Sequence, residues 1–403
     1  MKKINPCIIG LGYVGLPLFV SLKKKFRVVG YDLNKRRVVE LKKYIDRNNE
    51  FSKNDLKLQN ASIISSNHKD IKNSNFYIVT VPTPITKNNS PDLKFIKSAF
   101  GTISKYIKQN DIIILESTVY PGTTLDICKK IVKKKNKNIK FHIGYSSERI
   151  NPGDKIHNIK NISKVVSIDA DKKVIFLVKN IYKYVSKKIV FTKKIYEAEL
   201  SKLIENTQRD LNIGLMNELM ILCEKANLDF NEVIRLANTK WNFLRFKPGL
   251  VGGHCLPVDP YYLSYFAKKL KFKTQITLAA RKTNNYMEHF IYKKIILELK
   301  EKDQNKERKI AILGLTYKPN VPDYRNSLAL NIYKKLKKIY KKIIIYDPVI
   351  EKSFRKKNQI KNNLKDIVNS ETFILLVKHK QFDFVINFAK KNKKTIIDPL
   401  SLI

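Results

Sequence analysis

The chain has 403 residues, of which 43% are hydrophobic, so it is long enough for two or three domains and too apolar to be largely disordered. It carries 80 Lys and Arg against 35 Asp and Glu, a net charge of +45 that first suggests nucleic-acid binding. The lysines are spread along the chain without a zinc-finger, helix-turn-helix or aromatic-interleaved basic motif, so we expect a solvated Lys-rich surface that attracts an anionic substrate, and no nucleic-acid partner.

Residues 4–32 have the pattern of a strand, a glycine-rich turn, a helix and a second strand. In this context, the motif GLGYVG at 10–15 indicates a dinucleotide site, because the turn brings a pyrophosphate to the N-terminus of the helix. The first glycine permits the turn, the second lets the pyrophosphate approach, and the third allows close helix–strand packing. We therefore predict a dinucleotide site that includes Gly10, Gly12, Tyr13, Val14 and Gly15.

Asp32 lies at the end of the second strand of this unit. An acidic side chain there binds the ribose 2′-hydroxyl and repels a 2′-phosphate, which favours NAD over NADP. Arg36 and Arg37 follow closely and leave NADP as the minor alternative.

The uncharged stretch from Pro6 to Leu22 follows two lysines and superficially resembles a signal peptide. Three glycines interrupt it, and the dinucleotide interpretation explains them while a signal peptide does not. No other apolar run approaches the length of a membrane span, so we expect no membrane insertion.

Short apolar runs at Phe76–Val81 and Ile112–Leu115 alternate with polar and helical stretches. This alternation predicts a parallel α/β sheet, and we assign residues 1–195 to an N-terminal Rossmann NAD-binding domain.

A different pattern begins at Tyr196, where leucines recur at helical spacing with no turn signal until Asn227. We predict a long helix and a central helical domain over 196–300, interrupted by a loop from Asn242 to Pro260. The polar segment from Lys300 to Arg308 has the composition of a linker.

Lys202 and Asn206 lie four residues apart on the long helix and share one face. Such a pair is more often part of a solvated face than of a site, so the spacing alone does not assign a function.

The loop contains a second glycine cluster, GLVGGHCLPVD at 249–259. Cys255 follows two glycines, so its backbone is pliable and its side chain approachable, and Asp259 is near enough to serve the same site. In a hydride-transfer enzyme, such a thiol can attack an aldehyde and form a thioester after a second oxidation. The other cysteines form no CxxC pair, which argues against disulfides and zinc, and we expect each to be a small buried hydrophobic residue: Cys7, Cys128 and Cys223.

The last hundred residues repeat the first pattern. AILGLTY at 311–317 echoes CIIGLGY at 7–13, and Tyr346-Asp347 echoes Tyr31-Asp32. Thr316 and Pro319 replace the second and third glycines of the turn. We therefore predict, for residues 301–403, a Rossmann-like domain that has lost the pyrophosphate-binding turn.

Taken together, these segments resemble the UDP-glucose/GDP-mannose dehydrogenase family over nearly the whole chain. Seven blocks carry the resemblance, in the family's order: GLGYVGLP at 10–17, VPTP at 81–84, STVYPGTT at 117–124, SSERINPGD at 146–154, AELSKLIENTQRDLNI at 198–213, GGHCLPVDPYYL at 252–263 and GLTYKPNVPDYRNS at 314–327. KWNFLRFKPGLVGGHC at 240–255 is most similar to the UDP-N-acetylglucosamine 6-dehydrogenases of bacterial surface-polysaccharide pathways.

The resemblance implies roles for individual residues. Cys255 matches the thioester nucleophile, Lys202 the lysine that stabilises an alkoxide or oxyanion, and Asn206 its hydrogen-bonding neighbour. Asp259 matches an acid that assists proton transfer. Thr118 and Glu148 match groups that position the catalytic water, and Glu148 is in addition a candidate base in thioester hydrolysis. The cofactor site then adds Asp32, Arg37, Pro82, Thr83 and Thr118 to the glycine-rich turn. The substrate-binding residues are Glu148, Arg149, Lys202, Asn206, Gly252, Lys318 and Arg325.

The resemblance further implies a C-terminal domain that binds the UDP-sugar, a homodimer formed through the central helices, and oxidation of the sugar C6 hydroxyl with two NAD per turnover in the cytoplasm. UDP-N-acetylglucosamine is the favoured substrate, and the mannosamine, galactosamine and glucose forms remain open. The rival hypothesis is a two-electron dehydrogenase of the β-hydroxyacid type, which needs neither the GGHC cysteine nor a third domain. No metal site is expected.

Overall fold

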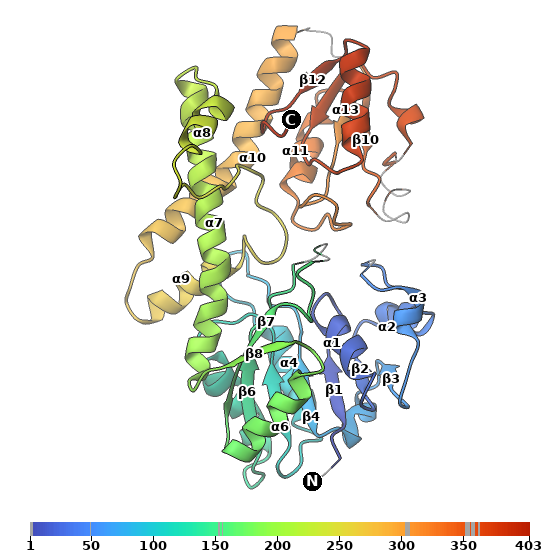
Figure 1. The fold of residues 1–403 in the computed structure, drawn as a ribbon, viewed down its shortest axis with the longest axis vertical. Coiled ribbons are helices and arrows are strands. Elements are labelled where there is room, and N and C mark those ends of the chain that lie inside the picture. Colours follow the sequence, from blue (N-terminus) through green and yellow to red (C-terminus); the bar gives the residue numbers. More distant parts are fainter. Residues whose placement is uncertain are drawn as a thin grey trace. The chain divides into compact units, whose positions relative to one another are not determined.

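The computed structural model describes residues 3–48, 50–151, 154, 156–302, 307–350, 355, 359–361 and 363–403. The chain forms two compact units, the first from Met1–Glu205 and Tyr261–Lys273 and the second from Asn206–Pro260 and Thr274–Ile403 (Figure 1). No helix in the described part of the chain is long and apolar enough to cross a membrane.

An eight-stranded sheet forms the centre of the first unit, in the order β3-β2-β1-β4-β5-β6-β7-β8. Its strands are β1 (Pro6–Ile9), β2 (Val29–Tyr31), β3 (Ile63–Ser65), β4 (Phe76–Val79), β5 (Ile112–Leu115), β6 (His142–Ser146), β7 (Ser163–Asp169) and β8 (Lys188–Phe191). The two strands predicted within residues 4–32 are confirmed as β1 and β2, and the apolar runs at 76–81 and 112–115 contain β4 and β5. The stretch that superficially resembled a signal peptide forms β1 and a helix of this unit.

The sheet departs from the predicted parallel arrangement at one place, because β6 and β7 pair antiparallel. The described residues of the connection, 147–151, 154 and 156–162, contain no helix that would cross back over the sheet. A parallel pairing needs such a crossover, so the chain returns in the opposite direction from the same edge.

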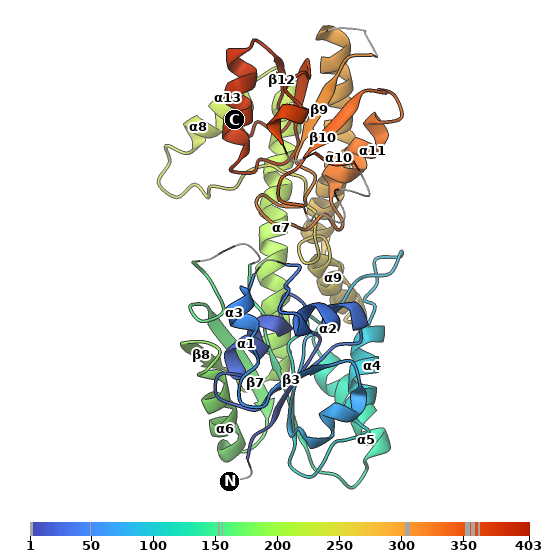
Figure 2. The same ribbon diagram turned by 90° about the vertical axis from the view of Figure 1, so that its right-hand side faces the viewer.

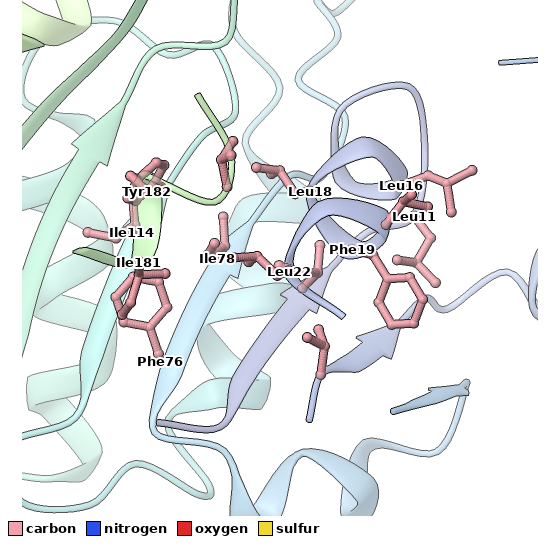
Figure 3. Packing of buried hydrophobic residues seen from close by; sticks show 14 of the residues in the cluster. Leu11, Leu16, Leu18, Phe19, Leu22, Phe76, Ile78, Ile114, Ile181 and Tyr182 are labelled. Carbon is pink, nitrogen blue, oxygen red and sulfur yellow. The ribbon is translucent and has the colours of Figure 1, made fainter. Parts of the chain in front are cut away.

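Helices cover both faces of this sheet: α1 (Gly15–Leu22), α2 (Lys35–Lys42), α3 (Lys53–Leu56), α4 (Lys94–Ile103), α5 (Lys130–Lys135) and α6 (Lys172–Tyr182). Apolar residues of α1 and α6 pack on the same face against strand residues such as Phe76, Ile78 and Ile114 (Figure 3). Figure 2 shows α4 and α5 on the other face. The two-layered cover explains why the central strands are buried throughout.

The predicted long helix is α7 (Ile195–Lys225), which begins in the first unit and ends in the second. The remaining helices of the predicted central region are α8 (Phe230–Ala237), α9 (Asp259–Lys269) and α10 (Gln275–Lys302). The predicted linker at 300–308 therefore begins as helix, and its residues 303–306 lie outside the described residues. The predicted domain limits at 195 and 300 stay a prediction.

The second unit contains the predicted Rossmann-like repeat, a parallel sheet in the order β10-β9-β11-β12. Its elements are β9 (Ile310–Leu313), α11 (Leu328–Leu336), β10 (Ile343–Tyr346), β11 (Thr372–Leu375), α13 (Phe382–Lys391) and β12 (Thr395–Ile397). α10 and α11 cover one face of this sheet, where the apolar core continues into α7, and α13 covers the other.

Candidate active site

The glycine-rich turn joins β1 to α1, and at two of its three glycines the backbone leaves no room for a side chain. Gly10 has φ +94°, and a Cβ at Gly15 would lie 1.8 Å from the Gly10 carbonyl oxygen. At Gly12 a Cβ would meet nothing within 4 Å, so this position faces open space. α1 starts without a side-chain cap and without an acidic residue in its first turn. The turn and the uncapped helix N-terminus fit the pyrophosphate of a dinucleotide.

Asp32 follows β2 directly and contacts this turn. Its Oδ2 accepts a hydrogen bond from the Leu11 amide at 2.7 Å, and its Oδ1 accepts one from the Asn34 amide at 2.8 Å. Arg37 is buried, donates from Nε to the Leu11 carbonyl at 2.9 Å and pairs with Asp46 at 2.9 Å. This placement shows that Arg37 supports the turn from inside the protein, while its predicted contact with the cofactor stays a prediction.

The other cofactor residues of the first unit follow the carboxyl ends of neighbouring parallel strands. Pro82 and Thr83 come after β4, and Thr118 comes after β5. Ser117 ties the two strand ends together by donating to the Val81 carbonyl at 2.7 Å. Ligands of open α/β sheets bind at this edge, so the sheet brings these residues to the same side as the glycine-rich turn.

Glu148 follows β6, the next strand, and both of its carboxylate oxygens are engaged. Oε1 accepts from the Arg149 and Ile150 amides at 2.6 Å each, and Oε2 accepts from Lys164 Nζ at 2.7 Å. Lys164 also donates to Glu116 at 2.5 Å. Three donors therefore hold the Glu148 carboxylate in a fixed orientation. Its role in positioning the catalytic water stays a prediction.

Sequence patterns did not reveal the buried charges behind Glu148. Burial raises the pKa of Glu116 to about 6, even though Lys164 opposes this shift. Burial alone would lower the pKa of Lys164, but the two carboxylates outweigh it and the net shift is upward. Tyr182 donates to the second oxygen of Glu116. The only signal in the sequence is a lysine among apolar residues of a strand, which is too common to identify such a network.

α7 brings two further groups to the first unit. Lys202 is buried, with 8% of its surface exposed, and within the described chain it has no carboxylate at ion-pair distance. The general expectation of a solvated face is therefore wrong for Lys202, and a buried cation with no counter-ion among the described residues is typical of a functional group. Arg149 forms an ion pair with Glu205 of the same helix.

In the second unit, Asn206 and Asp259 are brought together from positions 53 residues apart. Asn206 Nδ2 donates to Asp259 Oδ2 at 2.5 Å. Asp259 is 2% exposed and begins α9. Two predicted site residues are thus direct neighbours, as an active-site pair requires.

Cys255 is exposed, whereas Cys7, Cys128 and Cys223 are buried as expected. Burial raises the pKa of Cys7 and of Cys128 far above the ordinary range of a thiol, so both are unreactive. The cysteine that follows the glycine pair is thus the one that reagents and substrates can reach.

The loop before Cys255 is seated on the segment that follows β9. Gly253 has φ +87°, and a Cβ there would lie 2.7 Å from the Tyr317 ring. A Cβ at Gly252 would lie 2.6 Å from the Asn326 carbonyl oxygen, and Asn326 Nδ2 donates to the Gly253 carbonyl at 3.0 Å. The glycines therefore allow the loop to contact this segment at van der Waals distance.

The same segment carries both predicted nucleotide-binding cations. Lys318 is half-buried. Arg325 is 56% exposed and donates two hydrogen bonds to the Asp323 carboxylate, at 3.0 and 2.7 Å. Burial would raise the pKa of Asp323, but hydrogen bonds from His254 and Arg325 outweigh it and lower the pKa. His254 Nε2 lies 2.9 Å from Asp323 Oδ2, a contact that the sequence did not predict.

Comparison with known proteins adds independent information. Family models of the UDP-glucose/GDP-mannose dehydrogenase family match residues 4–186 (NAD binding domain), 196–286 (central domain) and 311–403 (UDP binding domain). The chain is 43% identical over 358 residues to Protein CapL of Staphylococcus aureus, covering 88% of this chain and 84% of that protein. It is 40% identical over 389 residues to a UDP-N-acetyl-D-glucosamine 6-dehydrogenase of Salmonella typhi, covering 95% and 91%. A solved UDP-D-ManNAc dehydrogenase from Pyrococcus horikoshii superposes with a TM-score of 0.86 at 28% identity, covering 99% and 96%.

Proposed function

Because the chain belongs to the UDP-glucose/GDP-mannose dehydrogenase family and is an NAD-dependent UDP-sugar dehydrogenase, we propose that it oxidises the C6 hydroxyl of a UDP-N-acetylhexosamine to the carboxylate. The reaction passes through a thioester on Cys255. One observation carries this mechanism: of the four cysteines, the one on the glycine-rich loop is exposed, and the other three are buried.

The chemistry balances as one alcohol, two NAD⁺ and one water giving one carboxylate, two NADH and three protons. Bound NAD supplies the hydride acceptor for both oxidations. The first oxidation converts the C6 alcohol to an aldehyde, and the Cys255 sulfur adds to its carbonyl carbon. Loss of a second hydride from that carbon leaves the thioester, and water then breaks the carbon–sulfur bond. Covalent capture keeps the reactive aldehyde in the site between the two oxidations.

The protein's own groups divide the remaining work. Lys202 and Asn206 stabilise negative charge on the sugar oxygen, because a preorganised cation and donor cost no reorganisation during the reaction. Asp259, which accepts from Asn206, assists proton transfer. Thr118 and the fixed carboxylate of Glu148 position the water that attacks the thioester.

UDP-N-acetylglucosamine is the favoured substrate. The support is the 40% identity to the Salmonella typhi enzyme, whose name specifies that sugar. The Pyrococcus horikoshii relative is named for UDP-D-ManNAc, so the mannosamine form is the principal alternative. A panel of the four UDP-sugars, compared by kcat/KM, discriminates between them.

Lys318 and Arg325 bind the UDP portion of the substrate. The enzyme works in the cytoplasm, and its product is a precursor for surface polysaccharide. We further propose a homodimer formed through the central helices. Large apolar side chains are exposed there, namely Leu215 and Leu222 on α7, Leu228, Leu236 and Trp241. Light scattering should give twice the 47.0 kDa mass of one chain, and a monomer would contradict this part of the proposal.

The test is the amount of NADH formed per UDP-N-acetylglucosamine consumed. Two NADH support the proposal, one NADH supports the two-electron rival, and no NADH with any of the four UDP-sugars overturns both. Cys255→Ser should give a slow single burst of NADH or a covalent adduct visible by mass spectrometry, because an alcohol is a weaker nucleophile than a thiol and its ester hydrolyses slowly. Normal turnover to the uronate by this variant would rule out the thioester.

A further inference from the structure

His254 connects the loop of the candidate nucleophile to the segment of the candidate nucleotide-binding cations. Its Nε2 donates to Asp323 Oδ2 at 2.9 Å, and the same carboxylate receives Nε and Nη2 of Arg325 at 3.0 and 2.7 Å. Asp323 is 4% exposed, whereas His254 is 37% and Arg325 56% exposed. The buried carboxylate thus lies between two partly exposed donors, one beside Cys255 and the other facing solvent.

The loop around Cys255 is fixed on both sides of this histidine. Before it, the Gly253 carbonyl accepts from Asn326, and the glycine lies on the Tyr317 ring. After it, the Cys255 carbonyl accepts from the Val258 and Asp259 amides at 3.0 and 2.8 Å. The backbone is held at these two places, and the side chain of residue 254 is a direct link between the residue next to the cysteine and the charged groups of the neighbouring segment.

Because His254 and Arg325 share the Asp323 carboxylate, a change in the partners of Arg325 affects the bond to His254. A nucleotide diphosphate that approaches Arg325 competes with Asp323 for the guanidinium. The carboxylate of Asp323 is buried and cannot lose a charged partner without a large free-energy cost. Its bond to His254 must therefore strengthen as Arg325 turns to the phosphate, and the loop that carries Cys255 becomes more tightly held.

We propose that His254 is a positioning residue that transmits nucleotide binding at Arg325, through Asp323, to the placement of the Cys255 thiol. This inference rests on the proposed function, because it takes a UDP-sugar as the ligand of Arg325. It adds a mechanism by which the nucleophile is held in place when substrate is bound and is less restrained when the site is empty.

The test measures the rate at which iodoacetamide alkylates Cys255, followed by mass spectrometry, with and without saturating UDP. UDP carries the diphosphate and lacks the sugar, and the three buried cysteines do not compete for the reagent. In the wild type, UDP should slow alkylation by at least about threefold, since strengthening one charge-assisted hydrogen bond has an effect of this order or larger. In His254→Leu, which keeps bulk beside Tyr317 but has no donor, UDP should still bind and alkylation should no longer respond.

Two further variants separate positioning from packing. His254→Gln retains an N–H donor of similar reach and should recover the response to UDP. His157→Leu is the matched control. It removes the histidine of an exposed His–Asp contact in the first unit, 3.0 Å from Asp154, and should behave as wild type. If UDP merely shielded the thiol, His254→Leu would keep the full response, and the inference would be overturned.

A matching readout comes from turnover. His254→Leu should slow the second oxidation by about tenfold while the first NADH forms at nearly the wild-type rate, because only the second needs the placed thiol. Equal slowing of both oxidations would contradict a positioning role. If UDP fails to bind the wild type at all, the proposed function falls together with this inference, whereas binding without any change in alkylation overturns the inference alone.

Discussion

Glu199 makes the stability of the first unit depend on pH in a direction opposite to that of most carboxylates. It lies on α7, fully buried, and accepts hydrogen bonds from the Gly122 amide at 2.6 Å and from the Thr124 amide and hydroxyl at 2.8 and 2.7 Å. These donors favour the ionised form, but burial has the larger effect and raises the pKa to about 7. Through these hydrogen bonds, Glu199 holds α7 to the loop that follows Thr118, at a point one turn before Lys202.

The magnitude follows from the two protonation states. Between the ordinary pKa of 4.5 and the folded-state value of about 7, the folded protein retains a proton that the unfolded chain releases. The free energy of unfolding must fall as pH rises through this window, by about 3 kcal/mol in all. For a unit of this size, that loss corresponds to roughly 6–12 °C in melting temperature.

The assay compares wild type with Glu199→Gln by scanning calorimetry from pH 4.5 to 8. The variant has a constant cost, because its amide NH₂ faces the Gly122 amide, but it has no titration at this position. The melting temperature of the wild type should therefore drop relative to the variant as pH rises. Glu197→Gln, at an exposed position on the same helix, should show no such trend. A difference that is constant with pH, or a wild type that gains stability, would refute the reasoning.

Three further outcomes are expected. Because of Asp32, kcat/KM should favour NAD over NADP by at least about tenfold, or about 1.4 kcal/mol, and equal use of both cofactors would contradict this. In calorimetric titrations, Arg325→Ala should raise the Kd of UDP by about tenfold and leave the Kd of NAD unchanged, since losing a charged hydrogen-bond donor costs about 1.5–3 kcal/mol. Loss of NAD affinity alone would refute the assignment of Arg325 to the UDP site. Gly15→Ala should weaken NAD binding at least about tenfold, because its Cβ would lie 1.8 Å from the Gly10 carbonyl oxygen, and an unchanged Kd would refute the turn's role.

Local patterns predicted most of the architecture. The strand, turn and helix around Gly10 depend on residues within one supersecondary unit, and the period of α7 is visible in its leucines. The same holds for the repeat at 311–317. The contrast between an exposed Cys255 and three buried cysteines also follows from sequence context, because two adjacent glycines mark a loop and apolar neighbours mark a core.

The sequence did not predict contacts between charged residues far apart in the chain. Lys164 and Glu116 are 48 residues apart, and His254 and Asp323 are 69 residues apart. The burial of a charged side chain depends on its partner, and a single sequence does not identify which distant residue that is. The antiparallel pairing of β7 was missed for a related reason, because strand direction depends on the path of the connection and not on the strand's own residues.

The two Rossmann-like halves show how one fold supports different binding. In both, the glycine before the turn has a left-handed φ, +94° at Gly10 and +85° at Gly314. In both, the acid after the second strand accepts from a turn amide at 2.7 Å, Asp32 in the first half and Asp347 in the second.

The acids differ in what else surrounds them. Asp32 is half-buried, whereas Asp347 is fully buried and lies 3.2 Å from Nε2 of His379. The Asn320 amide donates to Nδ1 of this histidine, so Nε2 carries the proton and donates to Asp347. Asp347 is therefore committed to the interior and cannot receive a ribose hydroxyl. The second half must bind its nucleotide through other groups, which is consistent with placing that task on the cations of the neighbouring loop, Lys318 and Arg325.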